Sequence, residues 1–524
     1  MEVIAAVTAW AIHIVSRNLP ASIVPWDIHG NGNAAAELMG RLSPSAQVYL
    51  PGSEEFTEAT TRWSVLHTPT FRLIIVPHTE DDVAEAVKYA NDLNLPFLAV
   101  NGGHGAISTV EKLHNGVGIW INQLRSVEIA QDGSTVTIGG GALSKDVTDI
   151  LWAAGKQTGE FHPITATISN SKLISYAVTG VCECTSILGP GLGGGHGILQ
   201  GRYGLVSDQF VSMNVVMADG NIHTISNDLD ADLWWAMRGA GHNFGIVTSA
   251  TSKIYDIQHR NWAYETFIYT GDSIESLYTT IVEQFPGNDS QSIEILNLSV
   301  FFNNPDIDPT REGVDVVDSK YSTSFRDLGP IFTSSTRGSY TDIPTWIGQN
   351  NESPSCQKAA LANVRFPIDL EFYNVTAQRK AYELFASRTQ EIPALNNSMF
   401  LFEGYSIQGV KAIPSESSAY PFRMDNLLVS PLLTYLPTGA ELDAAAANFG
   451  EDLRQILYEG SQKKELHTYV NYAFGDEAKE SWYGYEDWRQ DRLSALKRKY
   501  DPEGKFSFYA PILLHDGTPR LYQE

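Results

Sequence analysis

Three glycine clusters between residues 101 and 245 constrain the fold of this chain more than any other feature of its sequence. They read Asn101-Gly-Gly-His-Gly105, Gly189-Pro-Gly-Leu-Gly-Gly-Gly-His-Gly197 and Gly239-Ala-Gly-His-Asn-Phe-Gly245. A loop with few side chains lets a ligand touch the backbone, whose N–H groups bind phosphates. Tight turns and close packing would explain any single cluster. Three of them favour a region that holds a large phosphate-bearing cofactor.

The second cluster does not define a familiar phosphate loop by itself. Gly189, Gly191 and Gly194 satisfy the pattern G-x-G-x-x-G, but no clear strand–helix–strand unit surrounds them. An acidic residue about twenty positions later, which dinucleotide folds use to bind the ribose, is also missing. No cluster ends in Gly-Lys-Ser/Thr, so a P-loop is excluded as well.

The charge of the chain excludes several classes of partner. Its 524 residues include 36 Lys and Arg against 61 Asp and Glu, which gives a formal charge of −25. A nucleic-acid binder or a protein held by anionic lipid needs a basic surface, so neither is expected. With only 3 Cys in a chain long enough for several domains, apolar cores and not disulfides must hold the fold.

Targeting signals leave the secretory pathway and the cytoplasm equally open. Residues 3–15 form an apolar run that is too short to span a membrane, lacks a basic start and has no clean cleavage site. No membrane span is therefore predicted. Sequons of the form Asn-x-Ser/Thr, which mark glycosylation sites in secreted proteins, occur at Asn288, Asn297, Asn351, Asn374 and Asn396.

Periodicity predicts α+β structure in the first half of the chain. A strand at residues 73–76, a helix capped by Thr79 and Asp82, and a strand at 97–100 lead directly into the first glycine cluster. Further elements are expected as strands at 119–124 and 135–138, a helix at 144–154, and a hairpin of strands 210–217 and 222–225 around Asp219-Gly220.

The second half differs in composition. From about residue 256 to 465 the glycine clusters stop, and the sequence becomes aromatic and loop-rich without a recognisable motif. Near the end, an apolar stripe from Trp482 to Tyr500 predicts one amphipathic helix, which Asp501-Pro502 and Gly504 end.

Several motifs occur in an order that resembles a known family. They are the Gly-Gly-His of the first cluster, Cys182-x-Cys184 before Leu192-Gly-Gly-Gly-His-Gly197, Gly201-Arg-Tyr-Gly-Leu205 with Asp208, the stretch 232–248, and Tyr469-Val-Asn-Tyr472. Together they resemble the berberine-bridge-enzyme-like FAD-linked oxidoreductases, particularly the fungal ones, of the vanillyl-alcohol-oxidase superfamily. The resemblance covers roughly residues 45–255 and 465–505 and is weak between them.

The resemblance implies an α+β, two-domain FAD-binding fold of the PCMH type, with a second α/β substrate domain built on an antiparallel sheet. We expect an N-terminal extension at 1–45, the FAD-binding PCMH-type domain at 46–255, the substrate domain at 256–465, and a berberine-bridge-like segment at 466–524 that returns to the FAD domain.

The resemblance also implies that FAD is bound covalently. The family links a histidine at the position of His104 to the flavin 8α-methyl carbon, and bicovalent members attach flavin C6 through a sulfur at the position of Cys182. Attachment needs a thiolate, so a lowered pKa of Cys182 is expected. Cys184 is the reserve candidate, and Cys356 is expected to be structural. No metal site is predicted, because no other ligand pair has zinc spacing.

Other residues match cofactor-binding positions of the family. Besides His104 and Cys182, the predicted FAD-binding residues are Asn101, Gly102, Gly103, Gly105, Ser186, Gly193, Gly194, Gly195, His196, Gly197, Gly204, Leu205, Asp208, Gly245, Ile246, Val247 and Asn471.

The chemistry implied by the family is hydride transfer from a substrate carbon to flavin N5. Loss of hydride from an alcohol also requires a base for the hydroxyl proton. Tyr472 matches the tyrosine that serves as base in related oxidases, and Tyr469 is expected to line the substrate side. An unperturbed phenol has a pKa of about 10, so a nearby cation or hydrogen-bond donor must help Tyr472.

Three functions remain open at this stage. The first is a covalent-flavin oxidase that acts on a small alcohol, sugar or secondary metabolite and reduces O2. The second is a flavin dehydrogenase or oxidative cyclase on the same scaffold, and the third is a flavin-binding protein without catalysis. The co-occurrence of His104, Cys182 and Tyr472 argues against the third. Neither the substrate nor the oligomeric state can be predicted.

One stretch departs from the family pattern. Residues 159–177 separate two pieces, 155–158 and 178–182, that are nearly contiguous in the family. The stretch is either a lineage-specific loop or a translated intron.

Overall fold

The computed structural model describes residues 37–157, 180–257, 260–284, 298–302, 310–314, 320–425 and 427–513. The apolar run at 3–15, the stretch 159–177, and the sequons at Asn288 and Asn297 lie outside these residues. In the described part of the chain, no helix is both long and apolar enough to cross a membrane.

The first glycine cluster follows a small sheet whose strand order is β1-β2-β4-β3. β2, β4 and β3 are parallel, and β1 joins the edge antiparallel. The predicted capping box is confirmed, because the Asp82 N–H donates to Thr79 Oγ1 at 3.2 Å and Asp82 Oδ2 accepts from the Thr79 N–H at 2.8 Å. The elements are β1 (Gln47–Tyr49), α3 (Glu54–Thr60), β2 (Phe71–Val76), α4 (Glu80–Asp92), β3 (Phe97–Val100) and β4 (Gly116–Trp120).

The expected strand at 119–124 is wrong beyond Trp120, where a 3-10 turn (Ile121–Gln123) follows β4. The chain bends here because it packs on a ribbon of glycines. A Cβ atom on Gly141 or Gly139 would collide with the backbone oxygen of Ile121 or Leu124.

A second sheet, with order β5-β6-β10-β8-β9, is antiparallel throughout. The predicted hairpin is confirmed at β8–β9, where Gly220 has φ +78° and its N–H donates to Met217 O at 2.9 Å. The elements are β5 (Val127–Ile129), β6 (Thr135–Gly139), α5 (Ser144–Ala153), β7 (Lys156–Gln157), α6 (Leu188–Leu192), α7 (Gln200–Tyr203), α8 (Val206–Gln209), β8 (Phe210–Val216), β9 (Ile222–Ser226), α9 (Ala231–Ala240), β10 (Ile246–Lys253) and β11 (Tyr255–Asp256).

The large sheet dominates the second half and is also antiparallel, with order β15-β12-β14-β13-β18-β19-β16 and β17 beside β19. Its strands are β12 (Trp262–Tyr269), β13 (Leu298–Phe302), β14 (Thr310–Val314), β15 (Phe332–Gly338), β16 (Ala362–Arg365), β17 (Ile368–Leu370), β18 (Met399–Gly404) and β19 (Leu427–Tyr435).

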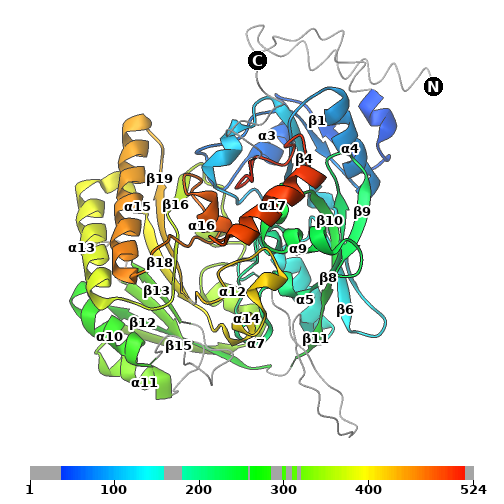
Figure 1. Cartoon of the computed structure of the whole chain (residues 1–524). Coiled ribbons are helices and arrows are strands. Elements are labelled where there is room, and N and C mark those ends of the chain that lie inside the picture. Colours follow the sequence, from blue (N-terminus) through cyan, green and yellow to red (C-terminus); the bar gives the residue numbers. More distant parts are fainter. Residues whose placement is uncertain are drawn as a thin grey trace, which may run out of the picture.

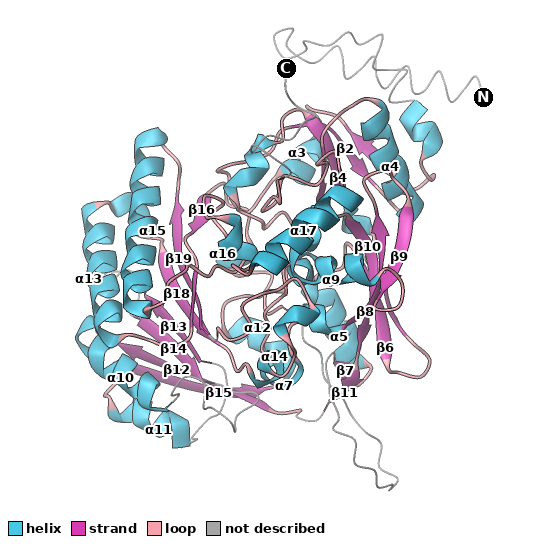
Figure 2. Cartoon of the chain, viewed as in Figure 1, coloured by secondary structure: helices cyan, strands magenta, loops and turns pink. Residues whose placement is uncertain are grey.

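Helices cover the outer face of this sheet, and its other face turns toward the first half of the molecule (Figures 1 and 2). A core of aromatic and aliphatic side chains fills the layer between the sheet and these helices. The helices of this half are α10 (Ile274–Gln284), α11 (Lys320–Asp327), α12 (Ile343–Trp346), α13 (Val375–Glu391), α14 (Gln408–Lys411) and α15 (Ala440–Ser461). The α+β architecture with two sheet-based regions, one of them built on an antiparallel sheet, is therefore confirmed.

The C-terminal segment crosses back to the first half of the molecule (Figure 1). The single helix expected here is two helices, α16 (Lys479–Tyr483) and α17 (Asp487–Tyr500). Gly484 separates them with φ +93°, a backbone conformation that interrupts a right-handed helix. Asn243 anchors the segment, since its backbone oxygen accepts from Lys497 Nζ and its Oδ1 accepts from the Ile512 N–H, both at 2.8 Å.

Candidate active site

The three glycine clusters converge on two residues of the C-terminal segment, Asn471 and Tyr509. A Cβ on Gly193 would collide with Asn471 Oδ1, and a Cβ on Gly105 would lie 2.9 Å from the Tyr509 ring. From the third cluster, His242 Nε2 lies 3.4 Å from Asn471 Oδ1, and the His242 and Tyr509 ring centroids are 4.4 Å apart. Loops far apart in sequence thus form one glycine-lined region.

His104 is buried in the first of these loops. Its imidazole stacks on Trp63 with ring centroids 6.2 Å apart, and its buried Nδ1 has no hydrogen-bond partner in the described part of the chain. Burial, followed by the charges of Lys358 and Arg62, lowers the pKa of His104 to about 4. The ring is therefore neutral at neutral pH, with a nitrogen that no protein group occupies.

The bonding of Cys184 and the pKa of Cys182 differ from what the sequence predicted. Cys184 forms a disulfide with Cys356, so Cys184 cannot serve as the reserve attachment point, whereas the structural role expected for Cys356 agrees with this bond. Cys182 keeps a free thiol, 3.4 Å from Cys184 Sγ. The lowered pKa expected for Cys182 is wrong for the protein alone, because burial raises it to about 11. The three sulfurs lie close enough to suggest a metal site, but the disulfide leaves a single thiolate donor.

The second cluster presents His196 to a group of tyrosines. Its Nδ1 donates to Gln200 Oε1 at 2.9 Å, so its Nε2 is left to accept from the Tyr420 hydroxyl at 3.1 Å. Burial lowers the pKa of His196 to about 4, so the ring is neutral. The Tyr469 ring lies edge-on to it at 4.6 Å, and Asn471 Nδ2 donates to the Tyr469 hydroxyl at 2.7 Å.

Tyr472 lies beside a buried carboxylate that the sequence reasoning did not identify. Its hydroxyl donates to Glu403 Oε1 at 3.1 Å, and the Tyr405 hydroxyl donates to Glu403 Oε2 at 2.6 Å. The Arg365 guanidinium lies 4.0 Å from the centroid of the Tyr472 ring. Arg365 is thus a cation close to Tyr472, as the sequence analysis expected for a phenol that acts as a base. Glu403 accepts a hydrogen bond from the same phenol.

The electrostatics of this pair decide which group can take a proton. Burial, and then the charge of Glu403, raises the pKa of Tyr472 well above its ordinary range, although Arg365 opposes this. Burial also raises the pKa of Glu403. Tyr472 therefore keeps its proton at neutral pH and cannot act as a base alone. Glu403 is the stronger acid of the two, so its carboxylate can be ionised while Tyr472 is protonated, and it can take the Tyr472 proton when the Tyr472 oxygen receives another one.

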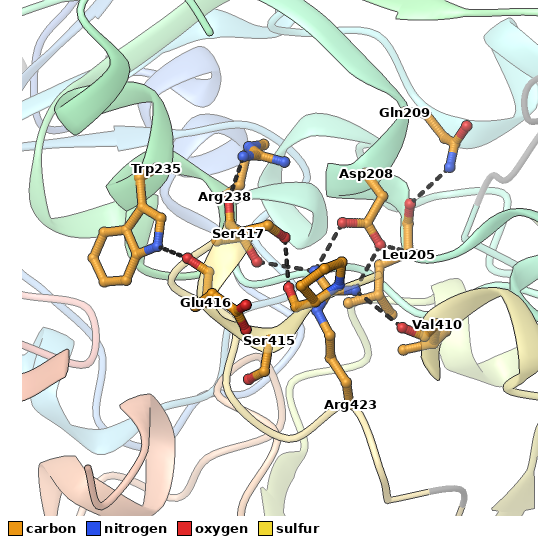
Figure 3. Close-up of polar contacts among 12 residues, drawn as sticks. Leu205, Asp208, Gln209, Trp235, Arg238, Val410, Ser415, Glu416, Ser417 and Arg423 are labelled. Atoms are coloured by element: carbon orange, nitrogen blue, oxygen red, sulfur yellow. Dashed lines mark hydrogen bonds and ion pairs between the residues drawn. The ribbon is translucent and has the colours of Figure 1, made fainter. Parts of the chain in front are cut away.

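Leu205 and Asp208 lie at the junction of the two halves (Figure 3). Gly204 adjoins them, since a Cβ on it would lie 2.8 Å from Asp208 Oδ2. The connector, residues 405–425, leaves the large sheet after β18 and packs here before β19 begins. Asp208 accepts from Arg423 Nη1 at 2.9 Å and Nη2 at 2.8 Å, and from the Leu205 N–H at 2.9 Å. Both members of the Asp208–Arg423 pair are at least 97% buried. This geometry gives Asp208 a structural role and provides no support for the cofactor contact expected of it.

Arg238 and Trp235 hold the same connector from α9. Arg238 Nη2 donates to Ser417 O at 2.6 Å, and Trp235 Nε1 donates to Glu416 O at 2.8 Å (Figure 3). The connector is therefore fixed to the first half at several points and brings Tyr405 and Tyr420 to His196.

The remaining predicted positions pack within the glycine-rich half. Asn101 Nδ2 donates to Gly140 O at 3.2 Å, and Ser186 Oγ accepts from the Gly189 N–H at 3.0 Å. Gly102 and Gly103 adjoin His104 and Arg62, whereas Gly194, Gly195 and Gly197 surround the turn that holds His196. Gly245, Ile246 and Val247 lie at the start of β10 against β8. Whether each one touches the cofactor remains a prediction.

The sequence reasoning missed Arg365 and Glu403, which strand pairing brings to one face of the large sheet. Glu403 lies opposite Leu428 of β19, and Arg365 lies opposite Leu432, four residues along the same strand. Residues at even spacing share a face of a strand. Glu403 could have been found from the sequence, because it is the single charged residue of the apolar run Met399–Gly404. A glutamate is rarely buried in such a strand unless it is paired or has a function.

The residues present fit a flavin dinucleotide. The orphaned Nδ1 of His104 and the convergence of three side-chain-poor loops provide an attachment atom and a surface of backbone N–H groups. When bound, FAD accepts a hydride and passes the electrons on.

The sequence of this chain is similar to those of known FAD-binding proteins. Residues 71–171 match the family described as FAD binding domain, and residues 468–512 match the one described as Berberine and berberine like. FAD-linked oxidoreductase chyH of Penicillium rubens is 47% identical over 98% of this chain and 99% of its own length. FAD-linked oxidoreductase chry5 of Gibberella zeae is also 47% identical, over 91% of this chain and 94% of its own.

Solved structures share the fold at lower identity. A chitooligosaccharide oxidase superposes with a TM-score of 0.75 and 19% identity, over 91% of this chain and 99% of that one. The glucooligosaccharide oxidase of Acremonium strictum, described with a 6-S-cysteinyl, 8α-N1-histidyl FAD, has a TM-score of 0.74 and 16% identity over 92% and 99%. The chain belongs to the FAD-linked oxidoreductases and is an FAD-dependent enzyme of the berberine-bridge-like type.

Proposed function

We propose that this enzyme is an oxidase that holds FAD covalently through His104 and Cys182. It takes a hydride from a small alcohol, sugar or secondary metabolite and passes the electrons to O2. The observation that carries the proposal is the hydrogen-bonded Tyr472–Glu403 pair, which lies beside the glycine-lined region and next to Arg365. Hydride loss leaves a proton on the substrate hydroxyl, and this pair can accept it.

The proton route follows from the direction of the hydrogen bond. Tyr472 donates to Glu403, so the substrate hydroxyl can transfer its proton to the Tyr472 oxygen while the Tyr472 proton moves to the carboxylate. Arg365 stabilises the negative charge that Tyr472 bears during this exchange. Tyr472 is then the residue in contact with substrate, and Glu403 is the terminal acceptor.

The attachment proposal rests on different atoms. His104 offers an unoccupied Nδ1 and stays neutral, which keeps the ring nucleophilic. Cys182 is the cysteine with a free thiol. The described linkage of the glucooligosaccharide oxidase uses the same two residue types. The high pKa of Cys182 means that attachment at this residue needs a base or the bound cofactor to draw off the proton.

Flavin reduction without oxygen tests the function. The purified protein is mixed anaerobically with a panel of alcohols, sugars and fungal metabolites, and flavin absorbance is followed. Bleaching by at least one of these compounds, with H2O2 formed stoichiometrically after air is admitted, supports an oxidase. Bleaching without H2O2 identifies a dehydrogenase or oxidative cyclase, and a colourless protein would refute all flavin chemistry.

Acid precipitation tests the attachment. Yellow colour should remain in the pellet of the wild-type protein and pass to the supernatant for the double variant His104→Ala, Cys182→Ala. The single variant His104→Ala should keep its flavin in the pellet, attached only through the sulfur of Cys182, and its flavin absorbance spectrum should be shifted. If the double variant keeps its flavin in the pellet, the assignment of both residues is wrong.

A further inference from the structure

A small cavity adjoins the Tyr472–Glu403 pair on the side of the connector. It is lined by His196, Gln200, Asp369, Tyr405, Tyr420 and Asp425, with Leu427 and Leu428. Tyr405 connects the cavity to the Tyr472–Glu403 pair, because it lines the cavity and its hydroxyl donates to Glu403 Oε2 at 2.6 Å. Glu403 and Asp369 flank Leu428 of β19 from opposite sides, so both acidic residues project from the same face of the sheet.

Asp369 is the unusual residue of this cavity. It is 97% buried, yet neither of its carboxylate oxygens has a hydrogen-bond partner among the residues that the structure describes. Its neighbour Asp425 is satisfied within the fold, since it binds Lys463 and accepts from His467 Nδ1 at 2.7 Å. Burial, and then the charge of Asp425, raises the pKa of Asp369 well above its ordinary value. The charge of Lys463 opposes this shift only in part, because Lys463 forms its ion pair with Asp425 and not with Asp369.

Three other buried carboxylates of the described chain have a cationic partner in the protein. Asp208, Glu477 and Asp501 each form an ion pair within the protein, with Arg423, Arg454 and Lys497 respectively. An unpaired buried carboxylate is costly, and proteins keep such groups paired or bound to a ligand. Gln200 Nε2 is also buried, and the described residues offer it no acceptor. Asp369 and Gln200 both line the cavity.

We propose that this cavity is a substrate subsite that binds a protonated amine through Asp369. The proposal rests on the oxidase function above and names a feature of its substrate: a cationic nitrogen at one end, with the oxidised carbon held at Tyr472. A cation supplies the N–H donors and the positive charge that Asp369 lacks. Gln200 then donates to an oxygen of the same ligand, and the rings of Tyr405 and Tyr420 enclose it. The net charge of −25 favours the approach of a cationic molecule.

A matched pair of probes tests the charge requirement. Tyramine and tyrosol share a phenol and a two-carbon arm, but tyramine ends in an ammonium and tyrosol in a hydroxyl. Isothermal titration calorimetry of the full-length protein, kept anaerobic to prevent turnover, measures both affinities. Loss of one partner of a buried, hydrogen-bonded charge pair costs enough that tyramine should bind about thirtyfold or more tightly than tyrosol.

Variants assign that preference to one side chain. Asp369→Asn keeps the shape of the residue and removes an unpaired charge, so folding should be retained and the tyramine preference lost. Asp369→Ala should lose it as well. Asp132→Asn is the control, because Asp132 is an exposed turn residue that accepts hydrogen bonds from Ser134 in the same loop. It should keep the full preference.

The outcomes separate this proposal from the proposed function. Equal affinity of the wild-type protein for both probes, or a preference that survives Asp369→Asn, would overturn the amine subsite. Either result leaves flavin reduction by an uncharged alcohol untouched. Conversely, binding heat is measured whether or not the flavin is reduced, so a failed oxidase assay does not obscure this result.

Discussion

The two sides of the active site are built in opposite ways. The cofactor side consists of loops in which glycine and histidine lie within a few residues of one another, as in Asn101–Gly105. The substrate side consists of single charged residues on separate strands, Arg365, Asp369 and Glu403, which become neighbours only when the large sheet forms. Cofactor binding is therefore encoded locally, and substrate chemistry is encoded by strand pairing.

The largest expected effect lies on the substrate side. Tyr472→Phe removes the hydroxyl that bonds to Glu403, and loss of a general acid–base group slows the reaction by about 10²–10⁴-fold. Stopped-flow anaerobic flavin reduction measures the rate. Tyr435→Phe is the matched control, since the Tyr435 hydroxyl also donates to a carboxylate, that of Asp443 at 2.9 Å, but in the core on the helical side. An unchanged rate in Tyr472→Phe would remove this residue from the mechanism.

The connector that joins the two sides depends on a buried ion pair. Arg423→Met leaves Asp208 buried without a counter-charge, which costs about 3–5 kcal/mol. Arg388→Met removes an exposed pair with Glu391 and should cost about 1 kcal/mol or less. The shift of the denaturation midpoint in guanidinium compares the two variants. Equal small shifts would show that the connector is not held by this pair.

The pH dependence of flavin reduction should report on Glu403. Burial raises the pKa of this carboxyl above its ordinary value of 4.5, and only the ionised form can accept the proton. The rate is therefore full above the raised pKa and falls as the pH drops through it, by about tenfold per pH unit below that point. The acidic limb should lie above pH 4.5 in the wild-type protein. A limb at or below that value would contradict a buried carboxylate base.

The smallest effect is expected on the cofactor side, far from the chemistry. Thr79→Ala removes the side-chain half of the capping box of α4 and should lower the free energy of unfolding by about 1 kcal/mol. The flavin reduction rate should stay unchanged. Thermal denaturation and stopped-flow measurements on the same sample check both statements, and a loss of activity at unchanged stability would contradict them.

The sequence predicted the secondary structure of the glycine-rich half well because its signals are local. Capping residues, the strand before the first glycine cluster and the hairpin at Asp219-Gly220 each occupy a few consecutive positions, and the structure confirms them. The tail helix was predicted as one element because its apolar stripe continues through Gly484. The backbone of Gly484 breaks the helix in a way that periodicity does not detect.

The contacts that the sequence could not predict join residues that lie far apart in the chain. Glu403 meets Tyr472, and Cys184 meets Cys356, across long separations that no local pattern encodes. The loss of Cys184 as an attachment candidate and the raised pKa of Cys182 both follow from packing that forms only in the folded chain.

The central claim is that Glu403 completes a proton route on the substrate side while the cofactor side holds the flavin independently. Glu403→Gln tests it directly, with flavin content and the rate of anaerobic reduction measured on one preparation. Glu391→Gln, a change of the same kind on the surface, serves as the control. We predict wild-type flavin content and a reduction rate lowered by about 10²–10⁴-fold. Reduction at the wild-type rate in a flavin-loaded Glu403→Gln protein would contradict the account.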